Sequence, residues 1–270
     1  MIVDMFRYLK SQSFKKYIPD WIIAIILSAY FFFIGEHARP FNRQFSLNDL
    51  TISHPFAVHE RVSGIACILL ATIIPLFVIF IASLKHYPSR HQFFHNLQIS
   101  ILGLVIALSL DGNLTDILKN WISRPRPDFL ARCGPAQGTP RDILVDVSVC
   151  TAPLGHPIFV DGMRSTPSGH SSISFAGFLY LTLWLCGQYK LFTKTHPLYK
   201  YLVSCSPLLL ATYVALSRTQ DYRHHFMDIF MGGCIGIFFA IVVYNRYFES
   251  IWSEEAGSPV DEEVESILPS

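Results

Sequence analysis

Charge is scarce in this chain. Only 15% of its 270 residues are Asp, Glu, Lys or Arg, while 51% are hydrophobic, and the formal net charge is +1. A soluble domain of this length needs a charged shell around its core, and a nucleic-acid-binding domain needs an excess of basic residues. We therefore expect neither a water-soluble globular protein nor a nucleic-acid partner.

Two further features are missing. No internal repeat is visible, so the inverted-repeat architecture of many transporters has no support. The first apolar block follows a basic segment and ends in GEHARP, without a small-residue cleavage pattern. We therefore expect no cleavable signal peptide, and the first block should remain as a membrane span.

Long apolar blocks recur along the chain. The clearest runs from 62 to 84 without a charged residue, and about 20 apolar residues are enough to cross a hydrocarbon core of roughly 30 Å. Five blocks are shorter or interrupted: Trp21–Gly35, Leu97–Leu110, Ser171–Gly187, Tyr201–Leu216 and Ile229–Tyr244. Because little polar surface is left to enclose them in water, the sequence predicts an all-α, polytopic membrane protein with six transmembrane helices.

These blocks divide the chain into three parts. Residues 1–20 form a cytosolic N-terminal segment, 21–247 a six-helix membrane domain, and 248–270 an acidic tail without Lys or Arg, which we expect to be disordered and cytosolic. The basic residues of the first segment place the N-terminus in the cytosol by the positive-inside tendency. The loops after spans three and five are two crossings apart, so they share the opposite, lumenal side.

The first of three polar clusters, residues 119–127, is cationic. Lys119, Arg124 and Arg126 come directly after the third expected span, and prolines at 125 and 127 favour an extended backbone. Arg forks and a Lys point charge suit the oxygens of a phosphate group. The alternative is a juxtamembrane basic patch that contacts lipid headgroups.

The second cluster, residues 166–170, predicts a helix start before the fourth span. Thr166 or Ser168 can cap the helix, Pro167 suits its first position, and Gly169 leaves room for an anion at free N–H groups. His170 could give a proton to a departing oxygen. An ordinary helix cap is the alternative interpretation.

The third cluster, residues 217–228, contains the candidate nucleophile. His224 lies four residues before Asp228, so in a helix the carboxylate would hold its ring and leave the other nitrogen free to attack. His225 is also near Asp228 by spacing, so spacing alone leaves both histidines as candidates. A His and an Asp at a helix start can also be plain caps.

Each cluster alone has a structural explanation, but all three explanations would have to hold at once. Taken together, the clusters therefore favour a functional site. Ionisable residues at membrane depth are costly and are functional candidates by default. Six cations should serve a substrate on the lumenal face: Lys119, Arg124, Arg126, Arg164, Arg218 and Arg223. Carboxylates are few among them, so we expect no metal.

These residues resemble the signature of the type-2 phosphatidic acid phosphatases, also called lipid phosphate phosphatases. The family signature consists of K-x6-R-P, P-S-G-H and S-R-x5-H-x3-D. It matches Lys119, Arg126 and Pro127, then Pro167 to His170, then Ser217, Arg218, His224 and Asp228. Residues 48–55, 126–133 and 217–226 resemble the fungal diacylglycerol pyrophosphate phosphatases in particular.

The resemblance implies a metal-independent lipid phosphatase without a cofactor. His224 would form a phosphohistidine, His170 would protonate the leaving group, and Asp228 would steady His224. The phosphoryl oxygens would be bound by Lys119, Arg126, Ser168, Gly169 and Arg218. The implied substrates are diacylglycerol pyrophosphate, phosphatidate and lysophosphatidate. The alternatives are a polyprenyl diphosphate, a sphingoid base phosphate, or a catalytically silent membrane adaptor of the same fold.

With both termini cytosolic, the site would open to a lumen of the endomembrane system, such as the vacuole, ER or Golgi. The partners we expect are the bilayer and a lipid phosphate within it, and the sequence gives no sign of an oligomeric state. Cys133 and Cys150 share the lumenal loop. A disulfide between them is reasonable in an oxidising lumen, and two free thiols are the alternative.

Overall fold

The computed structural model describes residues 2–87 and 89–260, and within these ranges every regular element is a helix. The α-helices are α1 (Ile2–Leu9), α2 (Gln12–Lys15), α3 (Ile18–Phe33), α4 (Gly64–His86), α5 (Arg90–Ile122), α6 (Phe129–Cys133), α7 (His156–Asp161), α8 (Gly169–Gln188), α9 (Leu198–Cys205), α10 (Pro207–Gln220) and α11 (Phe226–Tyr247). Short 3₁₀ helices are η1 (Gly35–His37), η2 (Leu50–Ile52) and η3 (Val147–Val149). The predicted all-α class is confirmed.

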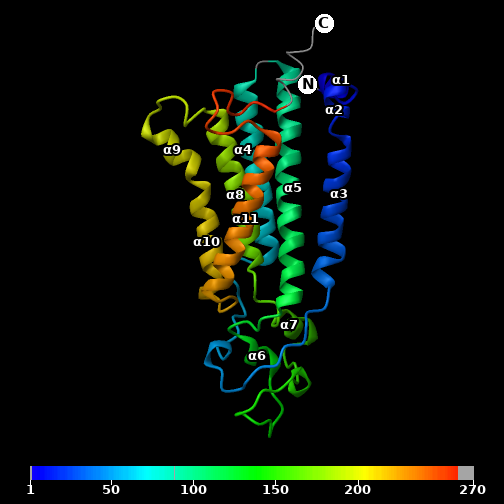
Figure 1. The fold of residues 1–270 in the computed structure, drawn as a ribbon, viewed down its shortest axis with the longest axis vertical. Helices are drawn as coiled ribbons and strands as arrows, with labels where there is room; N and C mark the ends of the chain where they lie inside the picture. Colours follow the sequence, from blue (N-terminus) through cyan, green and yellow to red (C-terminus); the bar gives the residue numbers. More distant parts are fainter. Residues whose placement is uncertain (1, 88, 261–270) are drawn as a thin grey trace.

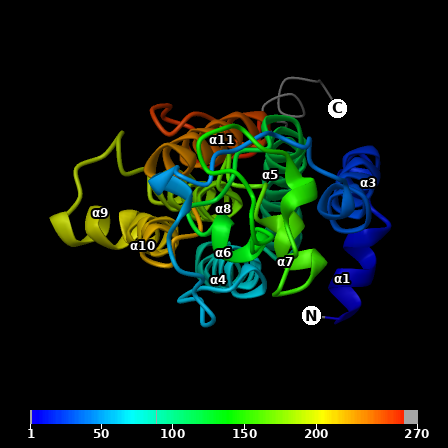
Figure 2. The ribbon, with the colours of Figure 1, turned by 90° about the horizontal axis from the view of Figure 1, so that it is seen from below.

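The long helices run side by side (Figure 1), and α8 lies at the centre of the bundle (Figure 2). It packs against α4, α5, α10 and α11. Its polar side chains Ser171, Ser172, Ser174 and Thr182 are buried. The central helix therefore carries polar groups where a lipid-facing helix would carry apolar ones.

Two glycines of α11 bring its backbone onto α8. A Cβ at Gly232 would lie 2.3 Å from the carbonyl oxygen of Ser168, and one at Gly236 would lie 2.2 Å from that of Ser172. Small residues at such crossings allow membrane helices to approach closely. The polar start of α8 is thereby held against the start of α11.

Five helical stretches are long and apolar enough to cross a membrane: Gln12–Phe33, Gly64–His86, Arg90–Ile122, Leu198–Gln220 and Phe226–Tyr247. The chain is thus a multi-pass membrane protein. The remaining expected span corresponds to α8, which is helical over its whole block but is not among the five.

Two spans differ from the apolar blocks. The third block ends at Leu110, but α5 continues to Ile122 and includes Lys119, because its polar side chains find partners inside the bundle. The Asn113 side chain, for example, donates to the Leu27 carbonyl at 2.9 Å. The fifth block is divided between α9 and α10 at Pro207, whose ring cannot continue a helix from the preceding turn.

The described part of the tail is folded. Phe248 and Ala256 are buried, the Glu249 N–H donates to the Ser258 carbonyl at 3.0 Å, and the Gln188 side chain donates to the Gly257 carbonyl at 2.8 Å. The expectation of a disordered tail is therefore wrong for residues 248–260, because apolar residues among the acidic ones pack on the end of α8. Residues 261–270 lie outside the described part of the chain.

At the opposite end of the bundle from α1, the loop regions with α6 and α7 form a cap (Figure 1). The cap has a small core of its own, with Phe45, Ile52, Phe129 and Met163. Cys133 and Cys150 form a disulfide within it, so the first of the two alternatives for these cysteines holds.

Candidate active site

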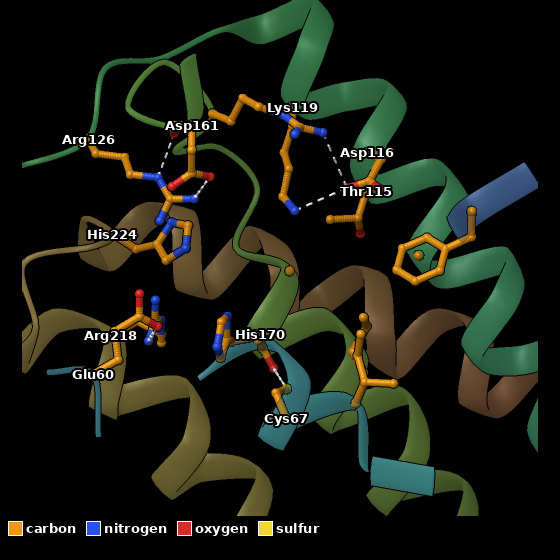
Figure 3. Close-up of a pocket in the computed structure, with 17 residues that line it drawn as sticks. Glu60, Cys67, Thr115, Asp116, Lys119, Arg126, Asp161, His170, Arg218 and His224 are labelled. Carbon is orange, nitrogen blue, oxygen red and sulfur yellow. Dashed lines mark hydrogen bonds and ion pairs between the residues drawn. The ribbon is translucent and has the colours of Figure 1, made fainter. Parts of the chain in front are cut away.

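A polar pocket lies where the cap meets the bundle (Figure 3). It has a volume of about 220 Å³ and is bounded by the ends of α5 and α10, the start of α8 and the turn before α11. Residues from all three polar clusters line it: Lys119, Arg126, Gly169, His170, Arg218 and His224. The predicted meeting of these distant segments is thus present in the structure.

Each of three cations in the pocket contacts a carboxylate that also lines it. Lys119 lies 3.1 Å from Asp116, Arg126 lies 2.7 Å from Asp161, and Arg218 lies 3.0 Å from Glu60. The guanidinium of Arg218 is 1% exposed and its Nε has no protein partner within the described residues. An anion entering the pocket would therefore find a donor, the Arg218 Nε–H, that no described protein group occupies.

Two of these groups, Arg126 and Asp161, have shifted pKa values and remain ionised at neutral pH. Burial lowers the pKa of Arg126 to about 10, which still leaves it charged at neutral pH. Burial opposes ionisation of Asp161, but Arg126 and Arg132 outweigh it and hold the pKa of that carboxyl below its ordinary value. The pocket therefore contains cations that are each paired with a carboxylate, and it is not a patch of positive charge alone.

In the part of the chain that the structure describes, one ring nitrogen of His224 is hydrogen-bonded to the protein, and the other is not. Its Nδ1 lies 2.7 Å from the Ser165 carbonyl oxygen, which can only accept, so Nδ1 carries the proton and Nε2 the lone pair. Within the described residues Nε2 has no protein partner, and the side chain is 3% exposed. Burial, with the nearby charges of Arg126 and Arg218, holds the pKa of His224 well below its ordinary value. The ring is therefore neutral and nucleophilic.

The expected direct contact between Asp228 and His224 is not formed. His224 lies in the turn before α11, His225 is the N-cap, and Asp228 at the third helical position reaches back to the N–H of His225 at 2.9 Å. The same carboxylate accepts from the Ser165 hydroxyl at 2.6 Å. Asp228 therefore acts on His224 through Ser165, whose carbonyl orients the imidazole.

The two candidate histidines are now distinguishable. Nδ1 of His225 lies 3.1 Å from Asp228, and its Nε2 lies 3.2 Å from the Thr51 carbonyl. Both nitrogens are engaged in structural contacts, and His225 is not among the residues that line the polar pocket. The arrangement favours His224 as the nucleophile.

The second cluster begins α8 with one of the two predicted caps, but Pro167 does not occupy the first helical position as expected. Ser168 is the N-cap and accepts from the Ser171 N–H at 3.5 Å, while Thr166 and Pro167 precede the helix. A Cβ at Gly169 would lie 2.8 Å from the Lys119 ammonium, so glycine leaves that space open. His170 lines the pocket, and its Nε2 lies 3.0 Å from the Val62 carbonyl. Ser168 supports this arrangement from outside the pocket lining.

Several lining residues escaped the sequence analysis. The most important are Glu60, Asp116 and Asp161. Asp116 stands three residues before Lys119 and could have been found had α5 been extended through it. Glu60 and Asp161 have no spacing relation to the cations that they contact, so no sequence signal marks them.

Residues 2–87 and 89–260 contain no group of three or more His, Cys, Asp or Glu side chains placed to hold a metal ion. The carboxylates of the pocket are instead distributed among the cations. Metal independence stays a prediction that needs an activity measurement.

The fold and this site agree with the comparison to known proteins. Residues 98–252 match the PAP2 superfamily model. The chain belongs to the PAP2 superfamily.

Three relatives of the chain are phosphatases by name. The chain is 46% identical to diacylglycerol pyrophosphate phosphatase 1 of Saccharomyces cerevisiae over 216 residues, which is 80% of this chain and 74% of the relative. It is 41% identical to the probable diacylglycerol pyrophosphate phosphatase 1 of Schizosaccharomyces pombe over 88% of this chain and 83% of that protein. It is 34% identical to lipid phosphate phosphatase 1 of Arabidopsis thaliana, over 91% of this chain and 72% of the relative. No solved structure matches the chain significantly.

Proposed function

We propose that this protein is a lipid phosphate phosphatase that hydrolyses diacylglycerol pyrophosphate, phosphatidate and lysophosphatidate through a phosphohistidine at His224. The observation that carries the proposal is the free Nε2 of His224 in a pocket lined by Lys119, Arg126 and Arg218. Family membership and the names of the relatives support the substrate class.

In the first step, Nε2 of His224 attacks phosphorus and the bond from phosphorus to the lipid oxygen breaks. The Nδ1–H bond to Ser165 stabilises the charge that the ring acquires. The protonated His170 gives its proton to the departing oxygen. Lys119, Arg126 and Arg218, with the start of α8 at Gly169, bind the phosphoryl oxygens, and stabilisation of this kind is the main protein contribution to phosphoryl transfer.

In the second step, a water molecule attacks phosphorus from the side that the lipid has left. His170, now neutral, accepts a proton from the water, and the bond from phosphorus to His224 breaks. Inorganic phosphate leaves and both imidazoles return to their starting protonation states. Ser168 and Asp228 are positioning residues in this scheme, since they hold the start of α8 and the Ser165 carbonyl.

The lipid chain has a route beside the phosphate site. An apolar cavity of about 250 Å³ is lined by α3, α4, α5 and α8 residues and shares Phe31, Ile68 and Ile173 with the polar pocket. An acyl chain lying there stays out of water while the headgroup reaches His224. Removing it into water would cost about 0.8 kcal/mol for each CH₂.

For the topology, we infer six spans with α8 enclosed by the other five and with both termini in the cytosol. Arg7, Lys10, Lys15 and Lys16 at the α1 end support this orientation. The disulfide in the cap supports an oxidising lumen on the side of the site. The proposed location is an endomembrane such as the vacuole, ER or Golgi.

The test is phosphate release by purified protein from a panel of lipid phosphates in the presence of chelator. We expect hydrolysis of the three proposed lipids, with sphingoid base phosphates and polyprenyl diphosphates as poorer substrates. A strict need for added Mg²⁺ would count against the mechanism. Absence of release from every lipid would favour the silent adaptor.

A further inference from the structure

Arg164 is a pocket-lining arginine that lies outside the three signature motifs. It is 7% exposed, its terminal nitrogen donates to the Gly35 carbonyl at 3.3 Å, and the same nitrogen lies 4.0 Å from Asp116. An arginine at this depth, with its side chain directed across the pocket wall toward the end of α3, is a costly feature. None of the steps above uses it.

The backbone on both sides of Arg164 is fixed. The Arg164 N–H donates to the Asp161 carbonyl at 3.1 Å, and the Ser165 N–H donates to the Arg124 carbonyl at 3.0 Å. Ser165 also carries the carbonyl that orients His224. The backbone that carries Arg164 is therefore held at a set place relative to the nucleophile.

That place is on the lipid side of the pocket. In Figure 3, His224, Arg126 and Arg218 occupy one side, and Lys119 and Asp116 the other. Arg164 belongs to the second group through Asp116, and its partner Gly35 directly follows the helix that bears Phe31. Phe31 lines both the polar pocket and the apolar cavity. A lipid with its tail in that cavity and its terminal phosphorus at His224 would extend along the side of the pocket that Lys119 and Arg164 line.

We propose that Arg164 forms a second anion subsite, with Lys119 shared between the two phosphates, that binds the lipid-side phosphate of a diphosphate lipid and so favours diphosphate over monophosphate substrates. The inference rests on the proposed function. When the terminal phosphorus of a diphosphate lipid is at His224, the group next to Arg164 is the second, lipid-side phosphate. In phosphatidate it is the uncharged glycerol ester, which has nothing for a guanidinium fork to bind.

The chemistry of the first step gives the subsite a role. When His224 attacks the terminal phosphorus of diacylglycerol pyrophosphate, the bond to the bridging oxygen breaks and its electron pair stays with phosphatidate. Negative charge thus develops on the lipid-side phosphate. A buried guanidinium near the departing oxygen stabilises that charge better than water does. The pocket volume of about 220 Å³ is many times the roughly 10–15 Å³ that one water-sized group requires, so several phosphate oxygens can lie in it.

The test compares kcat/KM for diacylglycerol pyrophosphate and for phosphatidate in the wild type and in Arg164→Gln. We expect the ratio of the two values to fall about tenfold, the typical effect of losing one charge-assisted hydrogen bond. Arg164→Lys keeps the charge and should restore part of the ratio. Arg141→Gln removes a charge from an exposed position in the cap, away from the pocket, and should leave the ratio unchanged.

A second measurement uses the wild type alone and covers the case in which Arg164→Gln fails to fold. Methylenediphosphonate should inhibit phosphatidate hydrolysis at a concentration about tenfold lower than inorganic phosphate does, because it fills both subsites. Equal inhibition by the two anions, or an unchanged substrate ratio in Arg164→Gln, would overturn the second subsite. A wild type that hydrolyses neither lipid would instead refute the proposed function.

Discussion

At the scale of residues, the state of His224 is set by a backbone carbonyl. The Ser165 oxygen fixes the proton on Nδ1, and the Ser165 hydroxyl is in turn held by Asp228. A carboxylate in direct contact would attract a proton to the ring more strongly than a carbonyl does. Orientation through Ser165 therefore keeps the imidazole neutral while the surrounding cations lower its pKa further.

The two adjacent histidines offer a matched pair of variants. We expect His224→Ala to abolish phosphate release, because Nε2 is the proposed nucleophile. His225→Ala should keep most of the activity and should instead lower stability by about 1 kcal/mol, the usual effect of losing an N-cap. Phosphate release and thermal unfolding in detergent check both expectations. Equal loss of activity in the two variants would contradict the choice of nucleophile.

The lowered pKa of His224 predicts the acid side of the pH profile. The ring must be neutral to attack, so activity is present above its pKa and is lost as the pH falls through it. Since that pKa lies well below 6.5 in the folded protein, the acid limb of kcat/KM should lie below pH 6.5. Because His224 must be neutral and His170 must be protonated in the first step, the profile should be bell-shaped. An acid limb at or above pH 6.5 would show that the cations do not act on His224 as described.

At the scale of elements, the start of α8 is placed by its neighbours. Gly232 of α11 lies against the Ser168 carbonyl, and the Ser168 N–H donates to the Asp228 carbonyl at 2.9 Å. The end of α5 brings Lys119 to Gly169 from the other side. The phosphate-binding helix start therefore depends on two helix crossings that are each controlled by a glycine.

Adjacent glycines of α11 test this dependence. A methyl group at Gly232 would lie 2.3 Å from the Ser168 carbonyl, whereas one at Gly233 would meet its nearest atom, the Ser171 hydroxyl, at 3.4 Å. We expect Gly232→Ala to cost about 1–3 kcal/mol and to reduce turnover. Gly233→Ala should be neutral or slightly stabilising, because alanine favours the helix by about 1 kcal/mol. Thermal unfolding and phosphate release measure both effects, and equal behaviour of the two variants would argue against the tight crossing.

At the scale of the whole molecule, the pocket and the described N-terminal helices lie at opposite ends of the bundle (Figure 1). The proposed orientation therefore has a direct consequence. In sealed vesicles with the cytosolic face outward, a short-chain lipid phosphate that cannot cross the membrane should be hydrolysed slowly until the vesicles are permeabilised. The measurement is phosphate release before and after permeabilisation. Full activity in intact vesicles would reverse the orientation.

Much of this architecture could be predicted from the sequence. Apolar blocks locate the spans because burial in lipid requires apolar side chains over a fixed length. The apolar blocks did not predict the full length of α5, because its polar side chains, such as Asn113, have partners remote in sequence. They also did not predict that the tail is folded, because apolar residues such as Phe248 pack on distant parts of the chain. Helical spacing also assigned Asp228 to His224, whereas the turn before α11 gives it to His225 and Ser165.

The sequence by itself determined which residue types are available and roughly where each helix lies, since both follow from local composition and spacing. The signature residues Lys119, Arg126, His170, Arg218 and His224 belong to this part. Tertiary structure alone decided which carboxylate accompanies each cation and which histidine keeps a free nitrogen. It also decided which of the six expected cations line the pocket, since Arg164 does and Arg124 and Arg223 do not. The physical reason is that hydrogen bonds and charge pairs act over a few ångströms, and side chains dozens of residues apart reach that distance only when the helices have packed.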